Sequence, residues 1–316
     1  MSEERLPLLE IKKLSKQFAL EGGRKLTAVD NVSLELYSGQ SLGIVGESGC
    51  GKSTLAKIVA HLESVTSGNI LYKNSDITHL KGEELRQNRK KLQMIFQDPS
   101  ASFNPRMKIG DMVSEPLVNF KLMNKREALQ ETKELLTMVG LPEDFISRYP
   151  HQLSGGQKQR AAIARALSLK PEILVCDEAT SDLDVSVQAQ VVQLLVDLQK
   201  EKGLSYIFIG HDLALIRNIC HRIAVMYLGR IVEIIDSETL TTAAVHPYTK
   251  ALLASVFSVK ERNAEIEIIQ GDPPSPSEIL PGCSFNSRCT ECGAKCLREK
   301  PIMKKIGINH FAACHL

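Results

Sequence analysis

The segment from Gly46 to Thr54 has the residue types and spacing that bind phosphate groups. It reads Gly-Glu-Ser-Gly-Cys-Gly-Lys-Ser-Thr and fits G-x-x-x-x-G-K-[ST] at each specified position. Glycines let the backbone bend around an oxyanion, so that successive N–H groups point at it. The lysine of such a loop reaches the β and γ phosphates, and the serine after it ligates Mg²⁺. We therefore predict a polyphosphate–magnesium site made by Gly46, Ser48, Gly49, Gly51, Lys52, Ser53 and Thr54.

The neighbours of this loop are the elements that must position it. Residues 41–45 form an apolar run typical of a strand, and residues 55–60 have helix-forming composition. The positive end of that helix would face the phosphates. The same field should lower the pKa of the Cys50 thiol and make it reactive, although a buried inert thiol is the alternative.

A second glycine turn stands about 100 residues later. Ser154, Gly155 and Gly156 lie directly before residues 161–167, which favour a helix. A hydroxyl, two glycines and a helix N-terminus can bind an anion, or they can simply cap the helix. The sequence around this turn does not decide between the two.

Two apolar strands end in polar side chains. Residues 172–176 precede Asp177 and Glu178, and residues 205–210 precede His211. Continuous apolar runs are typical of parallel strands buried on both faces, and ligands bind at the carboxyl ends of such strands. Asp177 can then hold the Mg²⁺ shell while Glu178 polarises water for in-line attack. For His211 a structural and a functional role are both open.

The composition of the chain argues against several classes of protein. The chain has 316 residues, with Lys plus Arg at 39 and Asp plus Glu at 37, so it has no general affinity for polyanions. No apolar run is long enough to span a bilayer. The first residues lack the apolar core of a signal peptide, which predicts a cytosolic chain without disulfides.

The rest of the chain suggests how it is organised. Residues 8–37 read as antiparallel strands, and Phe18 among them either stacks on a nucleobase or belongs to the core. Residues 92–96 read as a buried strand that ends at Gln97. We expect residues 98–170, approximately, to form an inserted helical lobe. A strand pair over residues 223–235 then closes the main domain near residue 255.

These motifs in this order resemble the ATP-binding subunit of ABC transporters. Leu153-Ser154-Gly155-Gly156-Gln157 matches the signature of that family, and it stands between the phosphate loop and Asp177-Glu178. The resemblance implies an α/β fold: a P-loop NTPase core with an antiparallel β subdomain and an inserted helical subdomain. It also implies a head-to-tail dimer in which each ATP lies between one phosphate loop and the partner's signature.

The resemblance assigns roles to single residues. Phe18 looks like the aromatic that stacks on adenine, and Gln97 like the glutamine that links Mg²⁺ and water to the membrane partner. Glu178 resembles the catalytic base, and His211 resembles the histidine that contacts the γ-phosphate. The loop through Asp184 resembles the one that signals across the dimer and borders the nucleotide.

Two residues depart from the family pattern. Ala179 stands where the family usually has proline, and Asp182 stands where it usually has alanine. The chemical groups of the site survive both changes, so we expect them to affect the coupling between the subunits and not the hydrolysis.

Within the family the chain looks most like the oligopeptide and dipeptide importer ATPases, whose nickel-importing relatives share the same features. The likeness rests on residues 96–99, residues 102–106, the stretch His246-Pro247-Tyr248-Thr249 and a cysteine-bearing tail. It implies a second, different ABC ATPase subunit, two transmembrane permease subunits and an extracytoplasmic solute-binding protein. The chain would lie peripherally on the cytoplasmic face of the membrane, and its sequence does not reveal which solute is carried.

The tail holds five of the eight cysteines. A proline-rich linker over residues 256–282 leads into Cys283, Cys289, Cys296 and Cys314, with Cys292 additional. Four thiolates can hold Zn²⁺ or an iron–sulfur cluster, and the spacing does not decide between them. The resemblance of residues 282–289 to the family's C-terminal extension implies a [4Fe-4S] cluster, with zinc and unmetallated thiols as alternatives. We expect three parts: an ATP-binding domain over 1–255, the linker, and a metal-binding extension over 283–316.

A soluble ABC ATPase that acts on nucleic acid or ribosomes is the competing function. Such proteins usually carry two ATPase domains or a long coiled-coil insertion, and the sequence shows neither. Its near-neutral charge also argues against a nucleic-acid partner.

Overall fold

The computed structural model of the chain describes residues 6–257, 271, 274–275 and 281–316. The chain forms two compact units, one made of residues 1–79 and 208–316 and the other of residues 80–207. The strand β8 (Ser205–Gly210) begins in the second unit and ends in the first. Within the described ranges, no helix is long and apolar enough to cross a bilayer.

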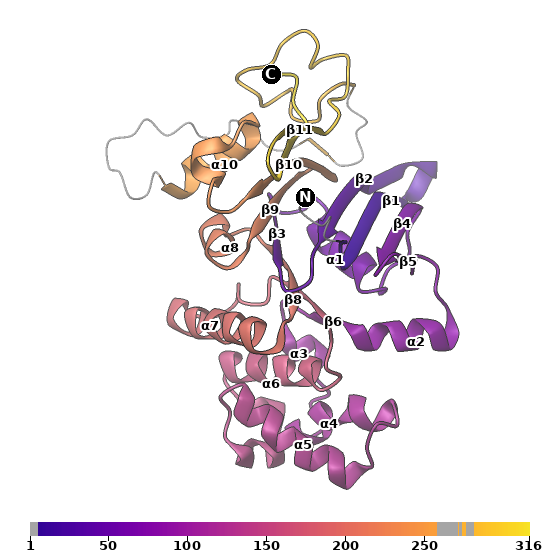
Figure 1. The fold of residues 1–316 in the computed structure, drawn as a ribbon, viewed down its shortest axis with the longest axis vertical. Helices are drawn as coiled ribbons and strands as arrows, with labels where there is room; N and C mark the ends of the chain where they lie inside the picture. Colours follow the sequence, from indigo (N-terminus) through magenta and orange to yellow (C-terminus); the bar gives the residue numbers. More distant parts are fainter. Residues whose placement is uncertain (1–5, 258–270, 272–273, 276–280) are drawn as a thin grey trace. The chain divides into compact units, whose positions relative to one another are not determined.

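The first unit contains an antiparallel sheet with the strand order β2-β1-β4-β5 (Figure 1). Alternate side chains of β1, including Leu9 and Ile11, are buried, so the sheet turns one face to the core. The antiparallel strands predicted over residues 8–37 are therefore confirmed. The strands are β1 (Leu9–Ala19), β2 (Lys25–Leu36), β4 (Ser67–Tyr72) and β5 (Ser75–Asp76), with a short helical turn η1 (Glu21–Gly23) between the first two.

A second sheet in this unit has the order β11-β12-β10-β9-β3. Every residue of β3 is buried, and β3 runs parallel to β9. The strands β9 and β10 pair antiparallel around Gly229, whose φ of 80° suits the turn, so this predicted strand pair is confirmed. The strands are β3 (Ser41–Val45), β9 (Arg222–Tyr227), β10 (Arg230–Asp236), β11 (Lys304–Gly307) and β12 (His310–Ala312); the helices are α1 (Lys52–Val59), α8 (Leu213–Ile219), α9 (Leu240–Ala243) and α10 (Pro247–Phe257).

The second unit is mainly helical, as predicted for residues 98–170. Its helices α4, α5 and α6 contact one another (Figure 1). Its strands β6 and β7 are parallel, and Leu92 pairs with Ile173. The elements are α2 (Gly82–Lys91), β6 (Leu92–Ile95), α3 (Pro99–Ser102), α4 (Ile109–Asn119), α5 (Lys125–Met138), η2 (Glu143–Ser147), η3 (Pro150–Gln152), α6 (Gly155–Leu167), β7 (Ile173–Asp177) and α7 (Val185–Lys202).

The tail joins the first unit through β12. Glu233 and Ile234 of β10 pair with Ala312 and Phe311, so the last strands extend the sheet that contains β3. The predicted linker over residues 256–282 lies largely outside the described residues, and the proposed limits of the three parts stay predictions.

Candidate functional site

The phosphate loop joins β3 to α1, which is the strand-loop-helix context predicted for it. Gly51 stands before the first residue of α1 with a φ of 106°. A Cβ atom on Gly51 would collide with the carbonyl oxygen of Ala28, and one on Gly46 with that of Met226. Glycine is therefore required at both positions by the close approach of neighbouring backbone.

Lys52 lies over this loop and is only 4% exposed. Its Nζ donates hydrogen bonds to the carbonyl oxygens of Gly46 at 2.7 Å and Glu47 at 2.8 Å. The ammonium is thus held at the centre of the loop, where an anion would meet a positive charge and a set of backbone N–H groups.

The environment of Cys50 differs from the sequence-based expectation. The thiol is buried, and burial raises its pKa, while the nearby Lys52 ammonium lowers the pKa by a smaller amount. The expected lowered pKa is therefore wrong, because desolvation of the thiolate outweighs the charges around it. The buried inert thiol, which was the alternative, is the better description.

Phe18 and His211 also belong to the first unit. Phe18 is half-buried on β1, and Lys16 Nζ lies 4.8 Å from the centre of its ring. Lys16 is itself paired with Glu63 at 2.7 Å. His211 is exposed just beyond β8 and next to Asp212, which caps α8. Contact of these residues with adenine and γ-phosphate stays a prediction.

The two predicted acidic residues follow β7 in the second unit. Asp177 is the last residue of that strand and is 7% exposed. Glu178 has a φ of 46°, in the left-handed region that side chains rarely adopt. A residue with a side chain pays free energy to adopt this backbone conformation.

The signature motif forms the start of α6. The Ser154 hydroxyl accepts from the Gln157 N–H, and Gln157 Oε1 accepts from the Ser154 N–H at 3.0 Å, which makes a capping box. A Cβ on Gly156 would collide with Val187 of α7, whereas one on Gly155 would lie 3.5 Å from Leu183, an ordinary contact. The signature and the loop through Asp184 are therefore neighbours in the second unit.

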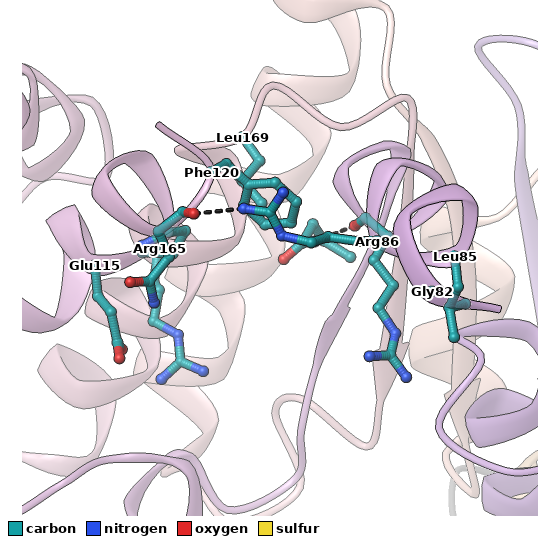
Figure 2. A pocket seen from close by; sticks show the side chains of 11 residues that line it. Gly82, Leu85, Arg86, Glu115, Phe120, Arg165 and Leu169 are labelled. Carbon is teal, nitrogen blue, oxygen red and sulfur yellow. Dashed lines mark hydrogen bonds between the residues drawn. The ribbon is translucent and has the colours of Figure 1, made fainter. Parts of the chain in front are cut away.

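Gln97 is exposed just after β6, and the next residue, Asp98, caps α3. The strand β6 also borders a pocket of about 580 Å³ in the second unit. Figure 2 shows the Arg86 guanidinium beside the Phe120 ring in this pocket. The guanidinium carbon lies 4.5 Å from the centre of the ring. The lining comprises Gly82, Leu85, Arg86, Arg89, Gln93, Glu115, Pro116, Asn119, Phe120, Arg165 and Leu169.

The predicted residues are thus divided between the units. The first unit contains the phosphate loop, Phe18 and His211, and the second contains Gln97, the signature, Asp177, Glu178 and Asp184. The assignment of single roles stays a prediction.

The tail cysteines do not form a metal site in this structure. Burial raises the pKa of the Cys283 thiol, and the neighbouring thiols Cys296, Cys314 and Cys292 raise it further. Burial likewise raises the pKa of Cys289 to about 11. In the described part of the chain no three His, Cys, Asp or Glu side chains are grouped to hold a metal ion.

Sequence reasoning missed the residues that hold the phosphate loop from outside. The Glu47 N–H donates to the Tyr248 hydroxyl at 2.9 Å, and the Glu47 carboxylate pairs with Arg288. Tyr248 and Arg288 lie in segments that carry the family resemblance, but the sequence alone assigns neither of them a contact with the phosphate loop. Because they lie about 200 and 241 positions from Glu47, no local pattern could have connected them.

Comparison with known protein families gives two matches. Residues 29–181 match the family described as ABC transporter, and residues 232–296 match the one described as oligopeptide/dipeptide transporter, C-terminal region. The chain is 48% identical to the putative oligopeptide transport ATP-binding protein YkfD of Bacillus subtilis, over 99% of this chain and 96% of that protein. It is 44% identical to the oligopeptide transport ATP-binding protein OppF of Salmonella typhimurium, over 99% of this chain and 97% of that protein.

Solved structures agree in fold. The ATP-binding cassette MJ0796, solved as a dimer bound to ADP and Pi, aligns with a TM-score of 0.66 and 32% identity over 72% of this chain and 98% of that one. The cbiO1 protein of Clostridium perfringens, part of the ABC transporter complex cbiONQ, aligns with a TM-score of 0.67 and 26% identity, over 81% of this chain and 96% of that one. The chain therefore has the α/β fold of ATP-binding cassettes, with mixed sheets and helices.

The two signature glycines make a matched test of this packing. Gly156→Ala should lower the free energy of unfolding by about 1–2 kcal/mol, because the added methyl group collides with the stiff Val187 side chain. Gly155→Ala should leave it unchanged or raise it, since alanine favours the helix and meets no close atom. Urea unfolding of both variants measures the difference. Adding Val187→Ala to Gly156→Ala should recover stability, and equal stability of the two single variants would contradict the packing described.

Proposed function

Because the chain belongs to the ABC transporter ATP-binding family, within its oligopeptide transport branch, we propose that it hydrolyses ATP to drive an importer for oligopeptides or dipeptides. It is an ABC-type ATPase, and ATP with Mg²⁺ is its nucleotide substrate. The names of its relatives favour peptides over nickel, and they do not favour a nucleic-acid or ribosomal target.

The observation that carries this function is the phosphate loop. Glycine is required at two of its positions, and Lys52 is held over it by two loop carbonyls. A loop that merely joined a strand to a helix would have no need for a buried lysine. Phosphate binding explains both features, because it needs N–H groups and a positive charge at one point.

The roles of the remaining residues are part of the proposal. Asp177 would complete the Mg²⁺ shell, and Glu178, with its strained backbone, would activate the attacking water. His211 would contact the γ-phosphate, and Phe18 would stack on adenine. Gln97 would link the metal site to the membrane partner.

The proposal also covers the ATP sites formed between subunits. The signature lies in the second unit, at the exposed end of α6, and the phosphate loop lies in the first. A head-to-tail partner would place its signature, including Ser154, Gly155 and Gly156, against this phosphate loop. The MJ0796 cassette was solved as a dimer with ADP and Pi, which supports a dimer of such chains. We propose that the partner is a second, different ABC ATPase.

An importer ATPase of this family works with permease subunits and a solute-binding protein. We propose that the pocket of Figure 2 receives a cytoplasmic segment of a permease, which would hold the chain at the cytoplasmic face of the membrane. Its lining combines the rings and aliphatic chains of Phe120, Leu85 and Leu169 with three arginines and one glutamate. An amphipathic helix with an acidic residue would complement it. The pocket also borders β6, the strand that leads to Gln97.

A metal centre in the cysteine tail has less support than the ATP site. Cys283, Cys289, Cys296 and Cys314 resemble the ligands of a [4Fe-4S] cluster in the family extension, but the structure does not group them as one centre. We therefore treat the cluster as a proposal that rests on the resemblance alone, with zinc as the other metal and Cys292 as dispensable. No step of ATP hydrolysis depends on it.

Two substitutions separate binding from hydrolysis. Lys52→Ala should weaken ATP binding and lower turnover by about 100-fold or more, because it removes the charge that faces the phosphates. Glu178→Gln should lower turnover similarly while ATP affinity changes by less than about threefold. Nucleotide binding and phosphate release are measured in the assembled complex. Normal turnover of Glu178→Gln would show that Glu178 is not the base.

Charge reversal tests the permease pocket. Arg89→Glu should release the permease subunits during detergent extraction, since it opposes an acidic partner. Arg126→Glu, on the exposed start of α5, is the matched control and should keep them. Retention of the permeases by both variants, measured by quantitative mass spectrometry, would exclude this pocket as their binding site.

Metal analysis decides the tail proposal. Protein purified without oxygen should contain about four iron and four sulfide per chain if a [4Fe-4S] cluster is present. Cys296→Ser should then lose the iron while Cys292→Ser keeps it. Zinc without iron would place the tail among structural zinc sites, and neither metal would leave the cysteines as free thiols.

A further inference from the structure

The tail reaches the phosphate loop through Arg288. Its Nη1 donates to Oε2 of Glu47 at 2.8 Å, and its Nη2 donates to Oε1 of the same carboxylate at 2.9 Å. The Arg288 side chain is 6% exposed and the Glu47 side chain 26%, so the guanidinium is sheltered from water while the carboxylate is partly exposed. Two parallel bonds between a guanidinium and a carboxylate fix both groups in position. Both residues belong to the first unit, so the contact lies within one compact body.

Aromatic rings hold Arg288 in place. Phe285, which is 2% exposed, meets the Tyr227 ring edge to face with their centres 5.2 Å apart. The Tyr248 ring lies 5.3 Å from Phe285. The guanidinium carbon of Arg288 lies 5.9 Å from the centre of the Tyr227 ring, and the Tyr227 hydroxyl accepts from its Nη1 at 3.4 Å. Arg288 therefore contacts a buried aromatic cluster as well as Glu47.

Glu47 transmits this contact to the residues that face phosphate. Its N–H donates to the Tyr248 hydroxyl at 2.9 Å, and its carbonyl oxygen accepts from Lys52 Nζ at 2.8 Å. The same carbonyl accepts from the Cys50 N–H at 3.3 Å. The side chain, the N–H and the carbonyl of Glu47 are thus all engaged. The residue that Arg288 contacts is therefore the one whose carbonyl accepts from Lys52.

The negative charge of Glu47 also affects how the loop binds phosphate. A carboxylate in a loop that binds anions repels the phosphates unless a cation neutralises it. Arg288 is the cation paired with it, and the hydrogen bonds to Glu47 raise the pKa of Arg288, so it remains charged.

We propose that Arg288 is a positioning residue of the ATP site, which neutralises Glu47 and fixes the backbone of the phosphate loop. This inference rests on the proposed ATPase function and gives the cysteine-rich tail a part in nucleotide binding. The tail and the ATP site are then one cooperative structure, since loss of the tail contact loosens the loop.

Matched substitutions in the full-length chain test this role. Arg288→Met should weaken binding of a fluorescent ATP analogue with Mg²⁺ by about tenfold, the effect of losing one charge-assisted contact. Arg298→Met, at an exposed arginine of the same tail, is the control and should bind like the wild type. The double variant Arg288→Met with Glu47→Gln should bind more tightly than Arg288→Met but less tightly than the wild type, because the unpaired carboxylate is gone while the contact that fixes the loop is still missing.

The affinities of these variants for MgATP distinguish the possible roles of Arg288. Wild-type affinity in Arg288→Met would overturn the inference. A double variant that binds no more tightly than Arg288→Met would also overturn it, because a role limited to folding of the tail would not depend on the Glu47 charge. Failure of the wild-type chain itself to bind MgATP would instead reject the proposed ATPase function.

Discussion

The phosphate loop depends on the close approach of neighbouring backbone. The carbonyl oxygens of Met226 and Ala28 occupy the space that side chains at Gly46 and Gly51 would need. Met226 belongs to β9, which runs parallel to β3 and thereby fixes the start of the loop. The sheet that contains β3 and β9 thus determines where the loop N–H groups point. Lys52 adds a positive charge at the same place.

The same sheet connects the C-terminal tail to the loop. Glu233 of β10 is fully buried and accepts from the N–H groups of Val245 and His246, while His310 Nε2 lies 2.7 Å from its Oε1. Burial lowers the pKa of His246 to about 4, so this ring is neutral near pH 7. These contacts fix the start of α10, which carries Tyr248 to the loop. Residues far apart in the chain therefore support one binding surface.

Much of the candidate site could be predicted from the sequence, because its parts are local patterns. The phosphate loop, the capped signature helix and the strand before Asp177 each occupy one short segment, and the structure confirms those elements. The pKa of Cys50 was mispredicted, because burial depends on distant packing that no local pattern reveals. The contact of Arg288 with Glu47 was missed for the same reason. The cysteine spacing suggested a metal centre, but spacing does not show how thiols converge, and here they are not grouped as ligands.

Extraction from membranes, followed by an ATPase assay, decides whether this chain supplies the free energy of ATP hydrolysis to a peptide importer. The chain is extracted from membranes under mild conditions, its partners are identified, and the ATP hydrolysis of the purified complex is measured with oligopeptide and solute-binding protein. We expect co-extraction with a second ATPase and polytopic permeases, and hydrolysis that rises when peptide and binding protein are added. Extraction with nucleic acid or ribosomes, and hydrolysis that responds to them and not to peptide, would contradict it.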